Sequence, residues 1–243
     1  MSQQDFDVYQ GMSWTDRAGY GVFGIALDFA DRVGKKNRFM DSIHKVAIQH
    51  ALRTSGDTYR RALDFGCGGG RLLSLLKNNA TKVYGVDRTQ ACLDLARAQN
   101  IIPTEQLVCW REGSLPFANG FFDLILCVYV LLTRDALQAL TPEMARVCES
   151  GGTALVLEQT DNARGLTLDR YRATFAQGGF SLQSARALRR SGGSRAMRLA
   201  TKPWATPWLG DLAVRWELAS MKRAQYGDHM QGYFDYLFVL KKN

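Results

Sequence analysis

Four glycines occupy residues 66–70 within the segment ALDFGCGGGRLLSLL. An apolar run precedes them and a leucine-rich run follows, which is typical of a turn between a strand and a helix. Glycine there lets backbone N–H groups and the positive end of the helix approach a ligand closely. Asp64 lies just before the turn, and Asp87 ends the next apolar run, 21 residues after Gly66. A carboxylate at that spacing reaches a ribose, so the pattern indicates a nucleoside-binding site.

The glycine turn has three other interpretations. A dinucleotide site of the G-x-G-x-x-G type that starts at Gly66 needs its third glycine at position 71, which is Arg71. A P-loop needs a Gly-Lys-Ser/Thr ending, which the segment lacks. A tight turn that serves packing alone is the remaining alternative.

The pattern D-x-G-x-G-x-G, formed by Asp64, Gly66, Gly68 and Gly70, resembles the first motif of the class I S-adenosylmethionine-dependent methyltransferases. Three further segments resemble later motifs of that family, in the same order: VYGVDR at 83–88, LPFANGFFDLIL at 115–126 and EMARVCESGGTALVLE at 143–158. The resemblance covers about residues 61 to 160.

The resemblance implies an α/β fold, a Rossmann-like three-layer sandwich around a seven-stranded, mostly parallel sheet whose last strand is antiparallel. Unbroken apolar runs that alternate with helical segments favour the same architecture. The expected strands are 61–65, 82–87, 106–110, 122–130, 151–159, 180–188 and 233–242. We expect one domain, in which residues 1–60 form an N-terminal helical cap and residues 61–243 form the methyltransferase domain. A basic, tryptophan-containing insertion is expected around 190–225.

The resemblance also implies roles for individual residues toward S-adenosylmethionine, whose product would be S-adenosyl-L-homocysteine. Asp64 would lie near the methionine part, and Asp87 would accept hydrogen bonds from both ribose oxygens, which charge strengthens. The expected cofactor-binding set is Asp64, Gly66, Cys67, Gly68, Gly70, Asp87, Arg88, Ser114, Leu115, Cys127 and Val128.

The adenine contact departs from the family pattern. The family usually has an acidic residue four positions before the leucine of LPF, and here that position is Arg111. Glu112 or Ser114 would substitute through a shortened loop. Arg88 is expected either to stack on adenine or to be a solvated charge.

Methyl transfer from a sulfonium mainly requires alignment of acceptor, methyl group and sulfur. A hydroxyl acceptor also benefits from a general base. The candidates are His229, Tyr129 and Glu158, with His44 and His50 in the cap. His229 is the first choice, because the loop before the last strand commonly borders the acceptor pocket. Each candidate also has an ordinary structural interpretation as a core or solvated side chain.

The charge points to anionic partners, since the chain carries a formal +8 and has a pI of about 9.4. Residues 164–223 hold twelve Lys and Arg against three Asp and Glu, a net of +9. Three tryptophans lie among them. This stretch is interpreted as a nucleic-acid surface, as a cap over a small anionic or saccharide acceptor, as a contact with an anionic membrane, or as a solvated face.

Several classes of protein are not expected. The longest apolar run, residues 124–132, is shorter than the roughly 20 residues of a membrane span, and the start of the chain has no secretory pattern. The five cysteines contain no CxxC pair. We therefore expect a cytoplasmic protein without disulfides, transmembrane segment or metal, and predict no oligomeric state.

The predicted function is S-adenosylmethionine-dependent O-methylation of a small-molecule or saccharide-type acceptor, anionic or lipid-linked. An RNA methyltransferase that uses the basic surface is one alternative, and a non-catalytic scaffold with the methyltransferase fold is the other.

Overall fold

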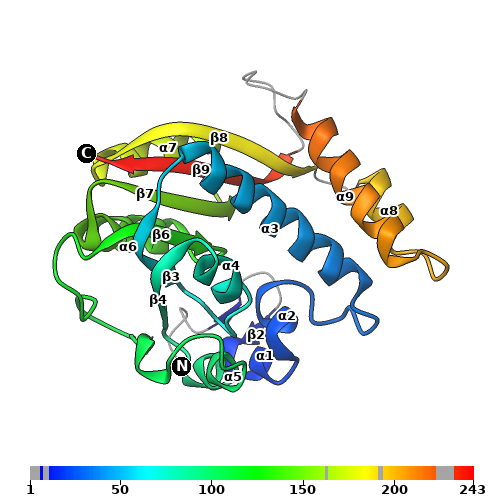
Figure 1. Cartoon of the computed structure of the whole chain (residues 1–243), viewed down its shortest axis with the longest axis horizontal. Helices are drawn as coiled ribbons and strands as arrows, with labels where there is room; N and C mark the ends of the chain where they lie inside the picture. Colours follow the sequence, from blue (N-terminus) through cyan, green and yellow to red (C-terminus); the bar gives the residue numbers. More distant parts are fainter. Residues whose placement is uncertain (1–5, 8–10, 162–163, 191–193, 223–232) are drawn as a thin grey trace.

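The structure is a computed structural model that describes residues 6–7, 11–161, 164–190, 194–222 and 233–243. Its centre is a seven-stranded sheet in the order β5-β4-β3-β6-β7-β9-β8 (Figure 1). The strands are β3 (Tyr59–Phe65), β4 (Ala80–Asp87), β5 (Leu107–Cys109), β6 (Phe122–Val128), β7 (Cys148–Gln159), β8 (Phe180–Arg190) and β9 (Tyr233–Lys242). This order confirms the predicted Rossmann-like α/β fold.

The direction of the strands decides which parts of the chain meet. Strands β3 to β7 pair in parallel, whereas β9 pairs antiparallel with both β7 and β8. Strand β8 therefore runs in the same direction as β7. The carboxyl ends of β3, β4, β6, β7 and β8 consequently share one edge of the sheet, which is where ligands bind in open α/β folds.

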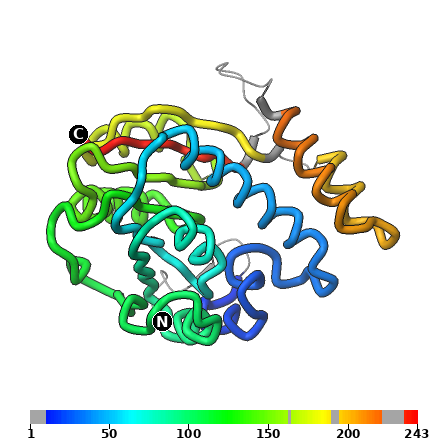
Figure 2. The backbone as a smooth tube through the Cα atoms, in the orientation of Figure 1, coloured from blue at the N-terminus to red at the C-terminus, as the bar shows by residue number. Residues whose placement is uncertain are grey.

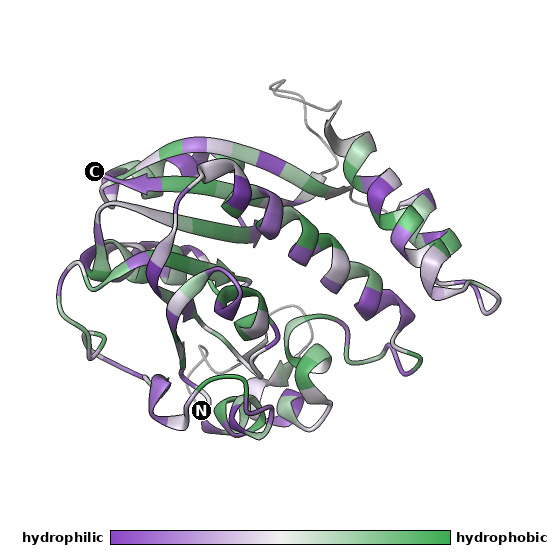
Figure 3. Cartoon of the chain, in the orientation of Figure 1, coloured by the Kyte–Doolittle hydropathy of each residue, from purple (hydrophilic) through white to green (hydrophobic). Residues whose placement is uncertain are grey.

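Helices cover both faces of the sheet, because its central strands are apolar on both sides (Figure 3). One face packs against α3 (Lys35–Ser55), α4 (Leu73–Lys77), α5 (Gln90–Ala98), α8 (Arg195–Ala200) and α9 (Pro207–Lys222). The other packs against α6 (Arg134–Val147) and α7 (Leu168–Gln177). The result is a three-layer arrangement with one large buried apolar cluster on each face of the sheet.

The chain before the sheet contains short elements and one long helix. A two-residue pair, β1 (Phe6–Asp7) and β2 (Met12–Ser13), precedes α1 (Trp14–Ala18) and α2 (Gly21–Ala26). Both short helices contact α5, whereas α3 contacts α8, α9, β8 and β9. A short 3-10 helix, η2 (Thr104–Gln106), leads into β5.

Proline occurs in two of these helices. Helix α6 is continuous through Pro142. The hydroxyl of Thr141, the residue before this proline, donates to the carbonyl oxygen of Leu137 at 2.6 Å. Helix α9 begins at Pro207, and proline suits the first helical position because no backbone N–H is needed there. Among the described residues, no helix has the length and apolar content that a bilayer crossing needs.

Candidate active site

The glycine turn joins β3 to the helical segment that leads into α4. Gly66, Gly68 and Gly70 have φ values of 76°, 52° and 81°, a region that residues with a Cβ rarely adopt. The backbone N–H groups of Gly66 and Cys67 both donate to the carbonyl oxygen of Val86, at 2.8 and 2.9 Å. The turn is thereby fixed to β4, directly before Asp87.

Close packing explains why side chains are missing from this turn. A Cβ on Gly66 would collide with Cγ2 of Val130, in the loop after β6. Cβ atoms on Gly68 and Gly69 would lie 3.2 Å from side-chain atoms of Ile25 in α2. The bare backbone therefore lies between the loop after β6 and α2, where a larger residue does not fit.

Asp87 is bonded to the turn itself. One carboxylate oxygen accepts the backbone N–H of Gly68 at 2.8 Å, and the other accepts that of Thr89 at 2.8 Å. Burial raises the pKa of Asp87, and these N–H groups partly offset the shift. The side chain is half-buried, and each carboxylate oxygen has acceptor capacity beyond these bonds. The carboxylate and the turn form one rigid cradle.

Asp64 lies buried at the end of β3, with 3% of its surface exposed. Burial raises the pKa of its carboxyl to about 7, the positive charge of Arg71 opposes that shift, and Asp87 adds to it. Arg71, at the position where a dinucleotide site has glycine, is buried as well, and its Nε has no hydrogen-bond partner among the described residues. A titratable acid and a cation thus flank the turn.

A chain of polar contacts runs from Arg71 to the end of β6. Arg71 Nη1 donates to Asp41 in α3 at 2.7 Å, and Arg71 Nη2 lies 3.4 Å from Nδ1 of His44. Nε2 of His44 lies 3.2 Å from the hydroxyl oxygen of Tyr129. An arginine only donates, so Nδ1 of His44 accepts, and Nε2 carries the proton that points to Tyr129.

Tyr129 adopts an unusual backbone conformation. Its φ is 58°, which is rare for a bulky residue and tends to occur at functional sites. Its N–H donates to the carbonyl oxygen of Leu157 at 3.0 Å, which fixes the backbone where β6 ends. The tyrosine ring is directed toward His44, at 5.4 Å between ring centroids and an angle of 78°.

Glu158, the second catalytic candidate in the described residues, holds the loop that follows Tyr129. One of its oxygens accepts the N–H groups of Val130 and Leu131, at 2.7 and 2.8 Å. The residue is fully buried, its Oε2 has no hydrogen-bond partner among the described residues, and burial raises the pKa to about 8. The geometry gives Glu158 a direct role in positioning the loop.

The other predicted cofactor residues lie along the same edge of the sheet or in the loop after β5. Cys67 and Cys127 are buried, and Val128 and Arg88 are half-buried. Leu115 is buried, its N–H donating to Glu143, whereas Ser114 is exposed. The first catalytic choice, His229, lies outside the described residues. His50 is exposed on α3.

Sequence reasoning missed Trp110, which follows β5. Its backbone N–H donates to the carbonyl oxygen of Asp87 at 2.9 Å, and its indole packs edge-on against Phe65 at 5.8 Å. A half-exposed tryptophan thus follows β5 next to Asp87 in the sheet, whereas Arg111 and Glu112 are exposed. Its place directly after an apolar strand is the one signal in the sequence that could have pointed to it.

The cysteines are free thiols, and four of the five are buried. Burial raises the pKa values of Cys67, Cys92, Cys127 and Cys148, which keeps these thiols protonated and unreactive. Within the described ranges, His, Cys, Asp and Glu side chains form no group of three or more that suits a metal ion.

The centre of the chain is similar to known methyltransferases. A family model described as a methyltransferase domain matches residues 63–156. Demethylmenaquinone methyltransferase from Tropheryma whipplei (strain Twist) is 30% identical over 141 residues, which cover 56% of this chain and 57% of that protein. The chain therefore matches little more than half the length of this curated relative.

Solved structures agree on the fold. Geranyl diphosphate C-methyltransferase from Streptomyces coelicolor, in complex with Mg²⁺, geranyl diphosphate and S-adenosyl-L-homocysteine, matches with a TM-score of 0.58 at 14% identity. The match covers 90% of this chain and 85% of that one. The [4+2]-cyclase SpnF matches with a TM-score of 0.53 at 18% identity, covering 81% and 80%. Residues 63–156 thus match the methyltransferase domain model, and the chain has the Rossmann-like fold of class I methyltransferases.

Proposed function

We propose that this chain transfers a methyl group from S-adenosylmethionine to a small-molecule acceptor. The observation that carries the proposal is the bond between Asp87 and the N–H of Gly68, which joins the carboxylate and the glycine turn into one cradle. The turn brings main chain without side chains against Asp87, and Asp87 offers acceptor capacity for hydroxyl groups one strand away.

The remaining polar groups at the edge suit the other end of the same cofactor. S-adenosylmethionine carries an ammonium, a carboxylate and a sulfonium besides its nucleoside. Asp64 would face the cationic groups, and the unpaired Nε of Arg71 is a donor that suits a carboxylate. Trp110 would flank the adenine, in place of the acidic residue that the sequence lacks. Bound S-adenosylmethionine would supply the electrophilic methyl group.

Tyr129 is the group that we assign to the acceptor. It follows β6, at the edge where the cradle lies, and its oxygen receives the Nε2 proton of His44. That hydrogen bond and the positive charge of Arg71 stabilise a negative charge on the tyrosine oxygen. In its ionised form, Tyr129 would accept the proton that a hydroxyl acceptor loses as the methyl group is transferred, which favours O-methylation. His44 and Arg71 are positioning residues in this scheme.

The relatives and the net charge of the chain support the proposed class of acceptor. The relatives named above include enzymes for demethylmenaquinone and geranyl diphosphate. An acceptor that is small, anionic or lipid-linked also suits a chain with a formal charge of +8. The proposal includes saccharide-type acceptors, because these carry hydroxyl groups that can be methylated. A cytoplasmic location belongs to it too, because S-adenosylmethionine is a cytoplasmic metabolite.

The test is incubation of the protein with isotope-labelled S-adenosylmethionine and fractionated extracts, followed by mass spectrometry of small molecules, lipids and RNA. The proposal predicts a labelled small molecule or lipid that is absent with the Asp87→Asn variant. Label confined to RNA would favour the RNA alternative instead.

A non-catalytic or non-methylating role is the second candidate, since a [4+2]-cyclase shares the fold. Binding of S-adenosylmethionine without labelled product in any fraction would favour it. The retained Asp64, Asp87 and glycine turn argue for methyl transfer.

A further inference from the structure

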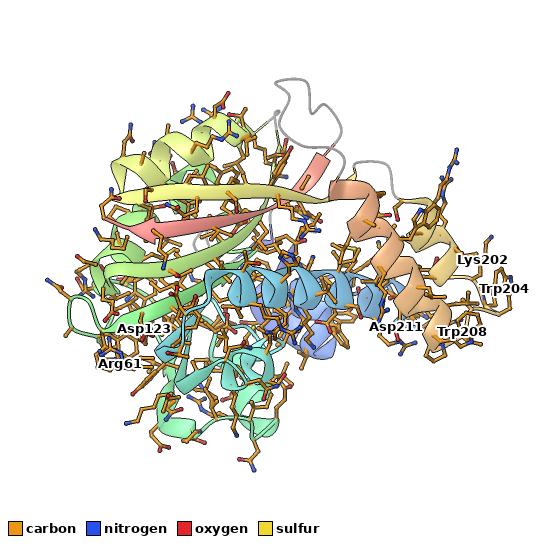
Figure 4. All side chains as sticks on the ribbon, turned by 45° about the horizontal axis from the view of Figure 1, so that its top comes forward. Arg61, Asp123, Lys202, Trp204, Trp208 and Asp211 are labelled. Atoms are coloured by element: carbon orange, nitrogen blue, oxygen red, sulfur yellow. The ribbon has the colours of Figure 1, made fainter. Side chains whose placement is uncertain are left out.

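The outward face of α9 carries a stripe of large apolar side chains. Trp208, Leu212 and Trp216 recur every four residues, about 6 Å apart along the helix axis. Their exposed fractions are 60%, 52% and 53%, and Trp204, in the turn before α9, is 62% exposed. Figure 4 shows Trp204 and Trp208 at the end of the α8–α9 hairpin that is remote from the sheet.

Internal packing accounts for the opposite face of the same helix. Ala213, Val214 and Leu218 are buried, and α9 contacts α3, α8 and β8. Helix α9 therefore carries large apolar side chains on two faces, and the fold covers one of them. The stripe of Trp208, Leu212 and Trp216 is the face that the described residues leave exposed.

Positive charge surrounds the stripe. The exposed ionisable side chains of residues 195–220 are four cations and one anion, a net of +3: Arg195, Arg198, Lys202, Arg215 and Asp211. Glu217 is buried on the inner face. Tryptophan flanked by Lys and Arg is the composition of helices that lie in a lipid headgroup layer.

The hairpin is held against α3. Lys35, the first residue of α3, donates to the carbonyl oxygens of Lys202, Pro203 and Ala205, at 2.6, 2.9 and 3.2 Å. In Figure 2 the hairpin runs beside the first half of α3, the helix that also carries His44. The hairpin follows β8, whose carboxyl end shares an edge with the glycine turn.

We propose that the outward face of the α8–α9 hairpin, from Trp204 to Trp216, docks on an anionic lipid bilayer with its tryptophans in the headgroup layer. Apolar side chains gain by leaving water, and the surrounding cations gain from anionic lipid. Nucleic acid fits less well, because Leu212 occupies the middle of the stripe and offers no surface for stacking bases. The inference goes beyond the proposed function and requires no methyl donor.

The experiment is binding of the full chain to unilamellar vesicles without S-adenosylmethionine, read by co-sedimentation and by quenching of tryptophan emission with brominated lipid. Vesicles with 30% phosphatidylglycerol in phosphatidylcholine should bind about tenfold or more tightly than pure phosphatidylcholine, and added salt should reduce the difference. The Trp208→Ala/Trp216→Ala variant should weaken binding by about tenfold or more. The Arg198→Glu/Lys202→Glu variant should bind the anionic vesicles more weakly than the wild type does, and its binding to pure phosphatidylcholine should not change.

The matched control is Tyr20→Ala/Arg53→Glu, which removes an exposed aromatic and an exposed cation elsewhere on the surface. It should bind vesicles nearly as the wild type does. Equal loss in the control, or no binding to either vesicle at millimolar lipid, overturns the proposal. Light scattering that shows a dimer abolished by Trp208→Ala/Trp216→Ala, without vesicle binding, assigns the stripe to a second copy of the chain. RNA binding lost in that variant, without vesicle binding, assigns it to nucleic acid.

Discussion

The hydroxyl oxygen of Tyr129 lies 3.2 Å from Nε2 of His44, a residue 85 positions earlier in the chain. Tyr129 reaches this position from a backbone with a φ of 58°, and His44 is fully buried in α3. This one contact therefore requires a strained backbone at Tyr129 and a buried histidine. That contact lies beside Arg71 and Asp64, at the edge where the cradle lies.

Removal of the Tyr129 hydroxyl should separate chemistry from cofactor binding. Tyr129→Phe keeps the ring and should lower kcat by about 10²–10⁴-fold, the usual worth of a general base, with little change in affinity for S-adenosylmethionine. His44→Ala should move the pH–kcat profile to higher pH, because the tyrosine oxygen loses its donor. His50→Ala, on the exposed side of α3, is the control. An unchanged pH profile in His44→Ala would reduce His44 to a packing residue.

Glu158 should make stability depend on pH. The unfolded chain loses this proton near pH 4.5, whereas the folded chain holds it until about pH 8. Between these values the folded chain binds more protons, so rising pH favours unfolding and the free energy of unfolding falls. The full shift corresponds to a loss on the order of 5 kcal/mol. Glu158→Gln has no carboxyl to ionise at this position. Its free energy of unfolding, measured with urea at pH 5 and at pH 8.5, should therefore lack this part of the decrease.

Glu149→Gln is the control for Glu158, since Glu149 lies on the same strand but pairs with Arg60 at the surface. It should retain the wild-type pH dependence. Glu158→Ala should destabilise the chain at every pH by about 2–4 kcal/mol, because the N–H groups of Val130 and Leu131 lose their acceptor. If the free energy of unfolding of Glu158→Gln changed with pH as it does in the wild type, the pH dependence could not be assigned to Glu158.

Thiol reactivity should single out one cysteine. Cys109 is exposed, whereas the other four are buried. A thiol reagent added to native protein at pH 8 should label one equivalent quickly and five after denaturation. Cys109→Ser should abolish the fast equivalent. Two or more fast equivalents would mean that the core opens readily.

Asp64 should couple cofactor binding to proton release. Its pKa is about 7 in the free protein, and a cationic ligand favours the ionised carboxylate. Affinity for S-adenosylmethionine should therefore rise with pH up to about 7, by as much as about tenfold per pH unit. Calorimetry in two buffers of different ionisation enthalpy measures the released proton. Asp64→Asn should release none, and equal proton release in both proteins would contradict this role.

The sheet was predictable because its strands are unbroken apolar runs that end in recognisable residues. The glycine turn and the FD pair at Phe122 and Asp123 mark strand ends in the sequence itself. Asp123 accepts the N–H groups of Arg60 and Arg61, so it holds β3 to β6 at the edge opposite the site (Figure 4). Local sequence therefore determined most of the fold.

The polar chain through Arg71 was not predictable in the same way. Asp41 and His44 lie in an amphipathic helix, where sequence pattern alone fits core packing or solvent equally well. Their meeting with Arg71 and Tyr129 depends on how α3 crosses the sheet, which is a tertiary property. Trp110 was missed for a related reason, since its position beside Asp87 follows from the pairing of β4 with β5.

The central claim is that Asp87 and the glycine turn form a cradle for S-adenosylmethionine, and calorimetric titration of the wild type and Asp87→Asn with that ligand tests it most directly. Loss of charged hydrogen bonds should cost about 1.5–3 kcal/mol, so the variant should bind roughly 10- to 150-fold more weakly. Asp94→Asn, an exposed residue of α5 paired with Arg97, should bind as the wild type does. Absence of heat from the wild type at millimolar ligand, or equal affinity in Asp87→Asn, would contradict the account.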